Sequence, residues 1–300
     1  SVMRGEDKVF SFTAKKNIIE NIEKENFDVI VTVHFFLTSP VLEYLETNKI
    51  DIPVYCIVTD PFTAPPIWFI NKNIKYFVFS EIAREIALQN GISQNNIFTV
   101  APLIGNKFLR ARNFDKLEIR KKLRFPLDKK IILVAAGGDG LYRGEKILQQ
   151  LVGLSDEFKI VVVCGREEKF FRQANILKRK NPQKIVEVFG FVDNMEELMS
   201  ASDLVLGKAG PATIFESLAV SRPLILTHYI WEQEKGNCDF VVENGLGFYE
   251  PNLKFLKDRI NSFFSKKDIS LEIEQKITSM FLRSGVGDIA KKILETKNPE

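Results

Sequence analysis

Residues 203–237 read DLVLGKAGPATIFESLAVSRPLILTHYIWEQEKGN, and this stretch decides the fold. An apolar run over 203–206 predicts a short strand, and the glycine-rich residues 207–210 predict a turn. Pro211 suits the first position of a helix, because the N–H that proline lacks would be unpaired there. The helix is predicted to lead into a second buried strand over 224–227. Strand, turn, helix and strand in this order indicate a doubly wound α/β fold.

The turn and the start of the predicted helix form a candidate phosphate site. A helix N-terminus at the carboxyl end of a strand presents unpaired N–H groups and a positive dipole end, and glycines let a ligand approach the backbone. Glu216 lies in the second turn of this helix. Its carboxylate either reaches the two hydroxyls of a ribose or merely interacts with the helix dipole. The candidate phosphate-site residues are Gly210, Pro211, Ala212 and Thr213.

A polar loop over 231–237, WEQEKGN, follows the second strand. Its hydrogen-bonding side chains lie at the same sheet edge as the turn and would suit a sugar. The alternative is a solvated loop that provides a helix N-cap. The residues assigned to the sugar are Gln233, Glu234 and Asn237.

Three runs carry a resemblance to a known family: GKAGPATIFESLA over 207–219, QEKGN over 233–237 and VVENGLG over 241–247. They resemble the donor half of monogalactosyldiacylglycerol synthases and processive diacylglycerol glucosyltransferases, which are members of glycosyltransferase family 28. A more distant resemblance is to the N-acetylglucosaminyltransferase that completes lipid II. The pattern is specific, because motifs at the right separation rarely coincide by chance. The resemblance implies a GT-B fold, with two Rossmann-like doubly wound domains facing a cleft.

A second glycine-rich turn follows the apolar run over 130–136. It lacks the GxGxxG spacing of dinucleotide enzymes, so by itself it is weak evidence for a phosphate site. The resemblance implies that this turn lies near the diphosphate, and that backbone groups of Phe191 or Val192 read the edge of a uracil ring. A plain helix N-cap just after Val192 is compatible with that role. The turn residues are Gly137, Gly138 and Gly140.

The segment PLIGNKF over 102–108 resembles the hinge between the two GT-B domains. We therefore expect an acceptor domain on the membrane side over residues 1–107 and a UDP-sugar donor domain over 108–300. A helical stretch over 271–294 is expected to cross back to the first domain, as the family implies.

In the first domain, His34 follows an apolar strand over 28–33 and Asp60 follows another over 54–59. Catalytic groups collect at the carboxyl ends of strands in open α/β sheets, so both are candidate catalytic residues. For His34, a packed histidine is an equal alternative. A helix is expected to start at Ser39-Pro40. The segment after Asp60 also resembles the family, except that Pro65 stands where its galactosyltransferases usually carry histidine, so no role of that histidine is transferred.

Aromatic residues on predicted loops and strand ends of the first domain suit a peripheral contact with an anionic membrane. The alternative, that they are core residues, explains at least half of them. The residues concerned are Phe35, Phe36, Phe62, Trp68 and Phe69.

Composition excludes several classes of protein and several kinds of partner. The 300 residues, 45% hydrophobic and 27% charged, suffice for two α/β domains. A net charge of +3 is too small to indicate a nucleic-acid partner. No apolar run approaches the roughly 20 residues of a membrane span. The two histidines and three cysteines show no ligating spacing, so we expect no metal site.

The start of the family pattern is not visible in this sequence. Relatives begin with a strand, a glycine-rich loop and a helix, whereas this chain opens at a predicted helix over 13–25. A parallel sheet without its central strand would expose apolar edges, so we expect a fragment with an incomplete first domain. Such a fragment should bind UDP yet transfer sugar poorly or not at all.

These observations lead us to expect a UDP-sugar-dependent hexosyltransferase. It would move a hexose to a diacylglycerol-type lipid by an inverting single displacement, as a cytoplasmic protein peripheral to the inner face of the cell membrane. Asp60 is the expected base, and UDP-sugar is a co-substrate with no further cofactor. The alternatives are a UDP-sugar 2-epimerase-like enzyme and a nucleotide-binding partner subunit that is inactive alone.

Overall fold

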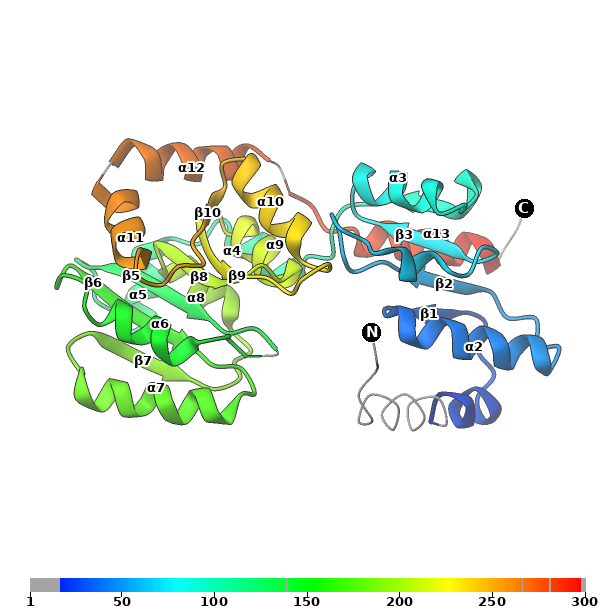
Figure 1. Ribbon diagram of the computed structural model, residues 1–300, viewed down its shortest axis with the longest axis horizontal. Coiled ribbons are helices and arrows are strands. Elements are labelled where there is room, and N and C mark those ends of the chain that lie inside the picture. The colour runs from blue at the N-terminus through cyan, green and yellow to red at the C-terminus, as the bar shows by residue number, and fades with distance from the viewer. Residues whose placement is uncertain (1–16, 139, 266, 281, 298–300) are drawn as a thin grey trace. The chain divides into compact units, whose positions relative to one another are not determined.

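The structure, a computed structural model, describes residues 17–138, 140–265, 267–280 and 282–297 (Figure 1). It divides into two compact units. Unit 1 comprises Ser1–Pro102 and Gly285–Glu300, and unit 2 comprises Leu103–Ser284. The break thus falls before Leu103, and the segment from Gly285 groups with unit 1.

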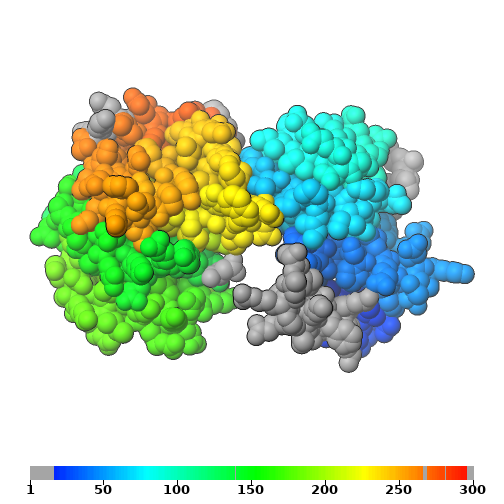
Figure 2. All heavy atoms as spheres, in the orientation of Figure 1, coloured from blue at the N-terminus to red at the C-terminus, as the bar shows by residue number. Residues whose placement is uncertain are grey.

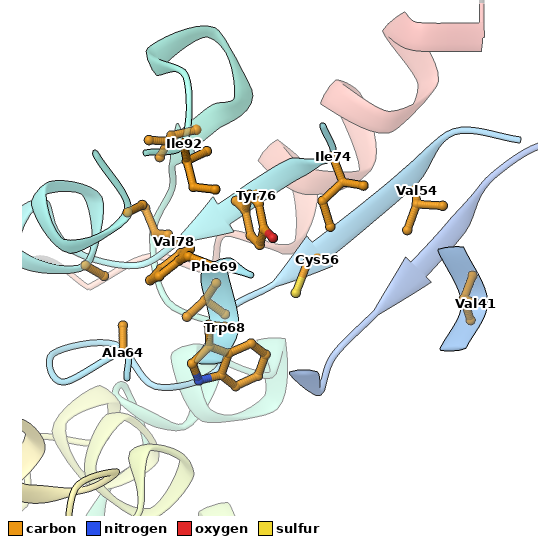
Figure 3. Packing of buried hydrophobic residues seen from close by; sticks show 14 of the residues in the cluster. Val41, Val54, Cys56, Ala64, Trp68, Phe69, Ile74, Tyr76, Val78 and Ile92 are labelled. Carbon is orange, nitrogen blue, oxygen red and sulfur yellow. The ribbon is translucent and has the colours of Figure 1, made fainter. Parts of the chain in front are cut away.

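Unit 1 is built on a parallel sheet with the strand order β1-β2-β3-β4. Side chains alternate between its two faces, as the pleat requires. Cys56 and Tyr76 pack with Trp68 and the apolar sides of α2 and α3, as Figure 3 shows in part. Tyr55 and Phe77, on the opposite face, pack with Ile289 of the last helix. The elements are β1 Ile30–Thr32, α2 Phe35–Thr47, β2 Val54–Ile57, η1 Pro66–Phe69, β3 Lys75–Val78, α3 Glu81–Gln89, η2 Gln94–Asn96, β4 Ile97–Thr99 and α13 Val286–Lys297, with residues 17–24 also helical.

Two expectations for unit 1 are wrong. Helix α2 begins at Phe35 instead of near Ser39, because the His34 side chain caps it and Pro40 is accommodated inside the helix. Trp68 and Phe69 are buried core residues, so they cannot provide the expected membrane contact. The predicted helix over 13–25 lies partly outside the described residues; its part over 17–24 is helical.

Unit 2 holds a fully parallel sheet with the order β10-β9-β8-β5-β6-β7. Winding reverses between β5 and β8, and right-handed crossovers place the helices after β5 and β6 on one face and those after β8 and β9 on the other. The elements are α4 Asn106–Ala111, α5 Lys116–Leu123, β5 Lys130–Ala135, α6 Gly144–Leu151, β6 Phe158–Val163, α7 Glu168–Lys180, β7 Ile185–Phe189, α8 Met195–Ala201, β8 Leu204–Lys208, α9 Pro211–Ala219, β9 Leu224–His228, α10 Lys235–Glu243, β10 Gly247–Tyr249, α11 Leu256–Ser265 and α12 Lys267–Ser279.

Three predicted boundaries after residue 203 change. Gly207 and Lys208 belong to β8, because Gly207 pairs with both neighbouring strands, and a Cβ there would lie 2.9 Å from the Ala135 carbonyl oxygen. Helix α10 takes up residues 235–237 of the expected loop. The stretch expected to be one helix over 271–294 is two, α12 and α13, separated near Gly285, where a Cβ would lie 1.9 Å from the Ala101 carbonyl oxygen.

Asp203 fixes the central strands of unit 2 at the end opposite the candidate site. Its carboxylate pairs with Arg120 at 2.6 Å and Lys116 at 2.8 Å, and accepts the Ile131 N–H at 2.7 Å. These contacts tie the starts of β5 and β8 to α5. Removing one partner of such a buried pair typically costs about 3–5 kcal/mol.

Two functional features are absent from the described part of the chain. No helix there is long and apolar enough to cross a membrane. Nor do the described residues contain a group of three or more His, Cys, Asp or Glu side chains that could hold a metal ion.

Candidate functional site

The candidate site lies at the carboxyl edge of the unit 2 sheet, where β5 and β8 are neighbours. The turn after β5 has Gly137 at φ +69° and Gly140 at φ +82°, a backbone region that side chains rarely adopt. A Cβ on Gly138 would meet nothing within 4 Å. The turn after β6 touches this one closely, since a Cβ on Gly165 would lie 2.5 Å from the Gly137 carbonyl oxygen. Glycine therefore shapes the turn and leaves open space beside Gly138.

Helix α9 begins directly after β8 without a side-chain cap. Gly210 is its N-cap, in an extended conformation, and Pro211 is its first residue, as predicted. The first backbone bond of the helix runs from the Ile214 N–H to the Gly210 carbonyl at 3.1 Å. The N–H groups of Ala212 and Thr213 precede this bond, so they are available to an anion at the positive end of the helix dipole.

A buried ion pair that the sequence did not predict lies next to the turn after β5 and the turn between β8 and α9. The Lys208 ammonium at the end of β8 is 3.1 Å from Glu234 Oε1, and Glu234 Oε2 accepts the Ile230 N–H at 2.8 Å. A Cβ on Gly210 would lie 3.3 Å from Lys208 Cε, and one on Gly137 would lie 3.8 Å from it. The lysine stem thus runs between the two glycine turns. Glu234, assigned to a sugar by sequence, has both carboxylate oxygens engaged within the protein.

The remaining residues of the polar loop divide into buried and exposed ones. Asn237 is fully buried and donates from Nδ2 to the Ala209 carbonyl at 3.0 Å, while its Oδ1 has no hydrogen-bond partner among the described residues. Gln233 is partly exposed. Trp231 is exposed and stacks on Tyr229, with ring centroids 6.1 Å apart. Asn237 therefore supports the turn after β8, and Gln233 remains the residue of this loop best suited to a sugar.

The loops after β5 and β9 meet at the surface. Figure 2 shows the yellow residues after β9 beside the green residues after β5. Tyr142 and His228 are in ring contact there, with centroids 5.7 Å apart. Burial lowers the pKa of His228, an effect that Glu234 opposes and Lys208 reinforces. A neutral imidazole is the form that these surroundings favour.

Glu216 lies in the second turn of α9 and is partly exposed. Burial raises its pKa to about 7, although Lys107 lowers it and Glu196 raises it further. Phe191, at the carboxyl end of β7, is exposed, and the Arg166 guanidinium lies 4.8 Å from its ring centroid. Val192 beside it is partly exposed. The uracil and ribose assignments stay predictions.

In unit 1, His34 and Asp60 lie at the carboxyl ends of β1 and β2, close to Trp68. Asp60 Oδ2 accepts the indole N–H of Trp68 at 2.7 Å in a buried setting. His34 Nδ1 accepts the Phe36 N–H at 3.3 Å, and the His34 and Trp68 rings are 5.9 Å apart. Burial lowers the pKa of His34, while Asp60 acts to raise it. The structure brings the two candidate catalytic residues together and gives each a local partner.

Comparison with known proteins gives two family matches. Residues 133–249 match the family described as glycosyltransferase family 28 C-terminal domain. Residues 6–103 match the family described as monogalactosyldiacylglycerol (MGDG) synthase. Together the matches cover most of both units.

Curated relatives agree with these matches. The chain is 32% identical to monogalactosyldiacylglycerol synthase 2 of Arabidopsis thaliana, over 89% of this chain and 58% of the relative. It is 25% identical to the processive diacylglycerol beta-glucosyltransferase of Bacillus subtilis, over 93% and 72% respectively. The chain spans about half the length of several plant synthases that it matches.

Solved structures share the fold. The UDP-GlcNAc 2-epimerase of Neisseria meningitidis, solved with bound UDP-GlcNAc, superposes with a TM-score of 0.71 at 13% identity, covering 95% of this chain and 80% of that one. Glycosyltransferases are among the other structures with this fold. At such low identity the likeness shows the fold alone, and it confirms two parallel-sheet α/β domains of the GT-B class.

Proposed function

This chain belongs to glycosyltransferase family 28, and from that premise we propose that it transfers a hexose from a UDP-sugar to a diacylglycerol-type lipid. The observation that carries the proposal is the carboxyl edge of unit 2. There, two glycine turns and an uncapped helix N-terminus surround a buried lysine at the point where the sheet reverses its winding. Ligands of open α/β sheets bind at such reversal points. The printed names of the relatives supply the acceptor class.

Each part of the donor has proposed contacts in unit 2. The diphosphate accepts hydrogen bonds from the N–H groups of Ala212 and Thr213 and lies against the turn at Gly137 and Gly138. The Glu216 carboxylate accepts hydrogen bonds from the ribose hydroxyls, and backbone groups of the loop after β7 read the uracil edge. Gln233 meets the hexose. A ligand held this way needs no metal to balance the diphosphate, because backbone dipoles and the helix N-terminus supply positive potential.

The proposed reaction is an inverting single displacement. A base removes the proton of the acceptor hydroxyl as its oxygen attacks the anomeric carbon, and UDP departs with the bonding electron pair. We assign the base role to Asp60. His34 is the weaker candidate, because its Nδ1 lone pair already accepts the Phe36 N–H, which leaves the proton of the neutral ring on Nε2.

A peripheral contact with an anionic membrane follows from the acceptor class, and we place it on unit 1 and at the inner face of the cell membrane. The membrane contact is supported by a set of exposed apolar side chains near His34 and Trp68. The buried Trp68 and Phe69 take no part in it. Val33 and Phe36 adjoin His34, and Ile67 and Ile70 adjoin Trp68 and Phe69. Exposed apolar side chains of this kind suit a lipid interface.

A UDP-sugar 2-epimerase-like enzyme, which would have the same fold, is the second candidate. Product analysis separates the possibilities. A lipid glycoside supports the transferase, and an epimerised nucleotide sugar supports the second candidate. Activity that appears only after another chain is added would indicate a nucleotide-binding partner subunit.

The first test concerns Glu216. Glu216→Ala should weaken UDP binding by about 1.5–3 kcal/mol, the range for a hydrogen bond to a charged group, without loss of the fold. Calorimetric titration measures the change, and Glu168→Ala, which removes an exposed carboxylate from the first turn of α7, is the matched control. Gln233→Ala should spare UDP and weaken the intact UDP-sugar. Unchanged UDP affinity in Glu216→Ala would remove this residue from the site.

A further inference from the structure

The rings of His228 and Tyr142 meet across the carboxyl end of β8. His228 is the last residue of β9, and Tyr142 belongs to the loop after β5. Those two strands flank β8, so the contact between the rings, whose centroids are 5.7 Å apart, crosses the end of the strand between them. Lys208 ends β8 in register with His228. His228 therefore lies beside the proposed diphosphate site, and the loop that carries Gln233 starts at the next residue.

A chain of two hydrogen bonds fixes which nitrogen of His228 carries the proton. The Thr227 hydroxyl donates to the Gly207 carbonyl of β8, with Oγ1 3.3 Å from that oxygen. A hydroxyl has a single proton and a carbonyl has none to give, so Thr227 Oγ1 acts as an acceptor in its other contact, 3.1 Å from His228 Nδ1. The proton of the ring is then on Nδ1.

The other nitrogen of His228, Nε2, keeps its lone pair. Burial lowers the pKa of His228, an effect that Glu234 opposes and Lys208 reinforces, so the ring is neutral near pH 7. A neutral imidazole with a proton on Nδ1 can only accept at Nε2. The side chain is partly exposed, which leaves a ligand room to reach it.

A bare nitrogen at this place selects one kind of ligand group. The oxygens of a diphosphate diester have no proton to donate near neutral pH, whereas a sugar hydroxyl has one. We propose that His228 is a specificity-determining residue, which accepts a hydrogen bond at Nε2 from a hydroxyl of the donor hexose. The inference rests on the proposed function, because it needs a UDP-sugar at the carboxyl edge of unit 2. A site built to pair with a hydroxyl rejects ligands that lack it.

The tautomer can be measured without any ligand. The chain has two histidines, and their contacts give them opposite forms, since His34 Nδ1 accepts the Phe36 N–H and leaves the proton on Nε2. Nitrogen-15 NMR separates protonated from bare imidazole nitrogens, and His34→Asn assigns the two sets of signals. We expect a protonated Nδ1 and a bare Nε2 in His228. A protonated Nε2 in His228 near neutral pH overturns the proposal.

Two variants of His228 separate its two nitrogens in calorimetric titration with UDP-glucose, UDP-galactose and UDP. His228→Asn keeps a donor for Thr227 but has no atom at the place of Nε2, so affinity for the better-bound UDP-hexose should fall about tenfold. His228→Gln carries an amide oxygen out to that place and should recover most of the loss. Affinity for UDP, which has no hexose, should match the wild type in both variants.

The UDP titration separates a contact with the sugar from a structural role. Equal losses for UDP and the UDP-hexose in His228→Asn overturn the proposal, and so does unchanged affinity for the UDP-hexose. A His228→Gln variant that binds no better than His228→Asn also overturns it.

Thr227→Val serves if His228→Asn fails to fold. It removes the acceptor of the Nδ1 proton at nearly constant volume, so less of the ring should have a bare Nε2, and affinity for the UDP-hexose should fall while that for UDP stays. Wild-type affinity for the UDP-hexose in Thr227→Val overturns the proposal. Absence of UDP and UDP-hexose binding by the unmodified chain refutes the proposed function itself, and this inference with it.

Discussion

The two units present the same kind of sheet edge, yet they treat their helix N-termini differently. In unit 1, His34 caps α2 through the Phe36 N–H and Ser80 caps α3 through the Ala83 N–H. In unit 2, α6 and α9 begin after central strands without a side-chain cap. A capping side chain occupies one of the first N–H groups of the helix, while an uncapped terminus presents all of them to a ligand. Parallel topology alone therefore does not make an anion site.

The polar side chains near these sheet edges also differ in what they contact. In unit 1, the Asp60 carboxylate is joined to the indole of Trp68, a contact between residues eight positions apart. In unit 2, the Lys208 side chain passes close to Gly137 and Gly210, and a Cβ on the neighbouring Gly138 would meet nothing within 4 Å. Unit 1 thus uses its edge residues to stabilise its own loops. Unit 2 holds a charge near a backbone surface that remains open.

The largest expected effect comes from converting α9 into a capped helix. Gly210→Asp should place a carboxylate at the N-cap, which stabilises the helix by only a few tenths of a kcal/mol relative to glycine but repels and displaces the diphosphate. We expect UDP-sugar affinity to fall about 100-fold, or about 2.7 kcal/mol, in calorimetric titration. Gly210→Ala, which adds a Cβ but neither cap nor charge, is the control. Wild-type affinity in Gly210→Asp would mean that the phosphates bind elsewhere.

A smaller effect should follow from breaking the pair in unit 1. Trp68→Phe removes the N–H that Asp60 accepts and leaves a buried carboxylate short of a partner, which should cost about 1–3 kcal/mol of unfolding free energy. Urea unfolding measures the loss, and UDP affinity should stay unchanged because the pair lies in unit 1. Asp60→Asn keeps an acceptor for the indole and should cost less.

The Asp60→Asn variant also tests the proposed base. If Asp60 removes the acceptor proton, this variant should lose transfer while its stability stays near that of the wild type. Wild-type transfer in Asp60→Asn would leave the carboxylate with the structural role alone.

The smallest effect concerns the His34 cap. His34→Ala should cost about 1 kcal/mol near neutral pH, while His34→Asn retains a capping acceptor and should cost less. Burial lowers the pKa of folded His34, with Asp60 opposing, so the neutral ring is favoured. Its contribution is present above the ordinary histidine pKa and is lost as pH falls through the lowered value, because a protonated Nδ1 cannot accept.

Urea unfolding of both variants at neutral and acidic pH checks this prediction. The stability gap between wild type and His34→Ala should close in acid, whereas the gap between His34→Asn and His34→Ala should persist. A gap between wild type and His34→Ala that is equal at both pH values would contradict the cap.

Much of the fold was predictable because its signals are local. Pro211 at the first position of α9 and the buried strand over 224–227 are confirmed, and Ser80 caps α3 from just before its first turn. Each depends on a proline ring, a capping hydroxyl or an apolar period that acts within a few residues. Two of the predicted glycines, Gly137 and Gly140, adopt positive φ angles for the same kind of local reason.

The tertiary structure decided what local signals cannot carry. The pairing of Lys208 with Glu234, the contact of Lys107 with Glu196, and the anchoring of Asp203 by Arg120 join residues that are far apart in the chain. They form because β9 lies beside β8 and α4 lies against α8, an arrangement that a run of residues does not encode by itself. Local pattern determines which residues form a strand or a turn, whereas strand order determines which charges meet, and those charges define the candidate site.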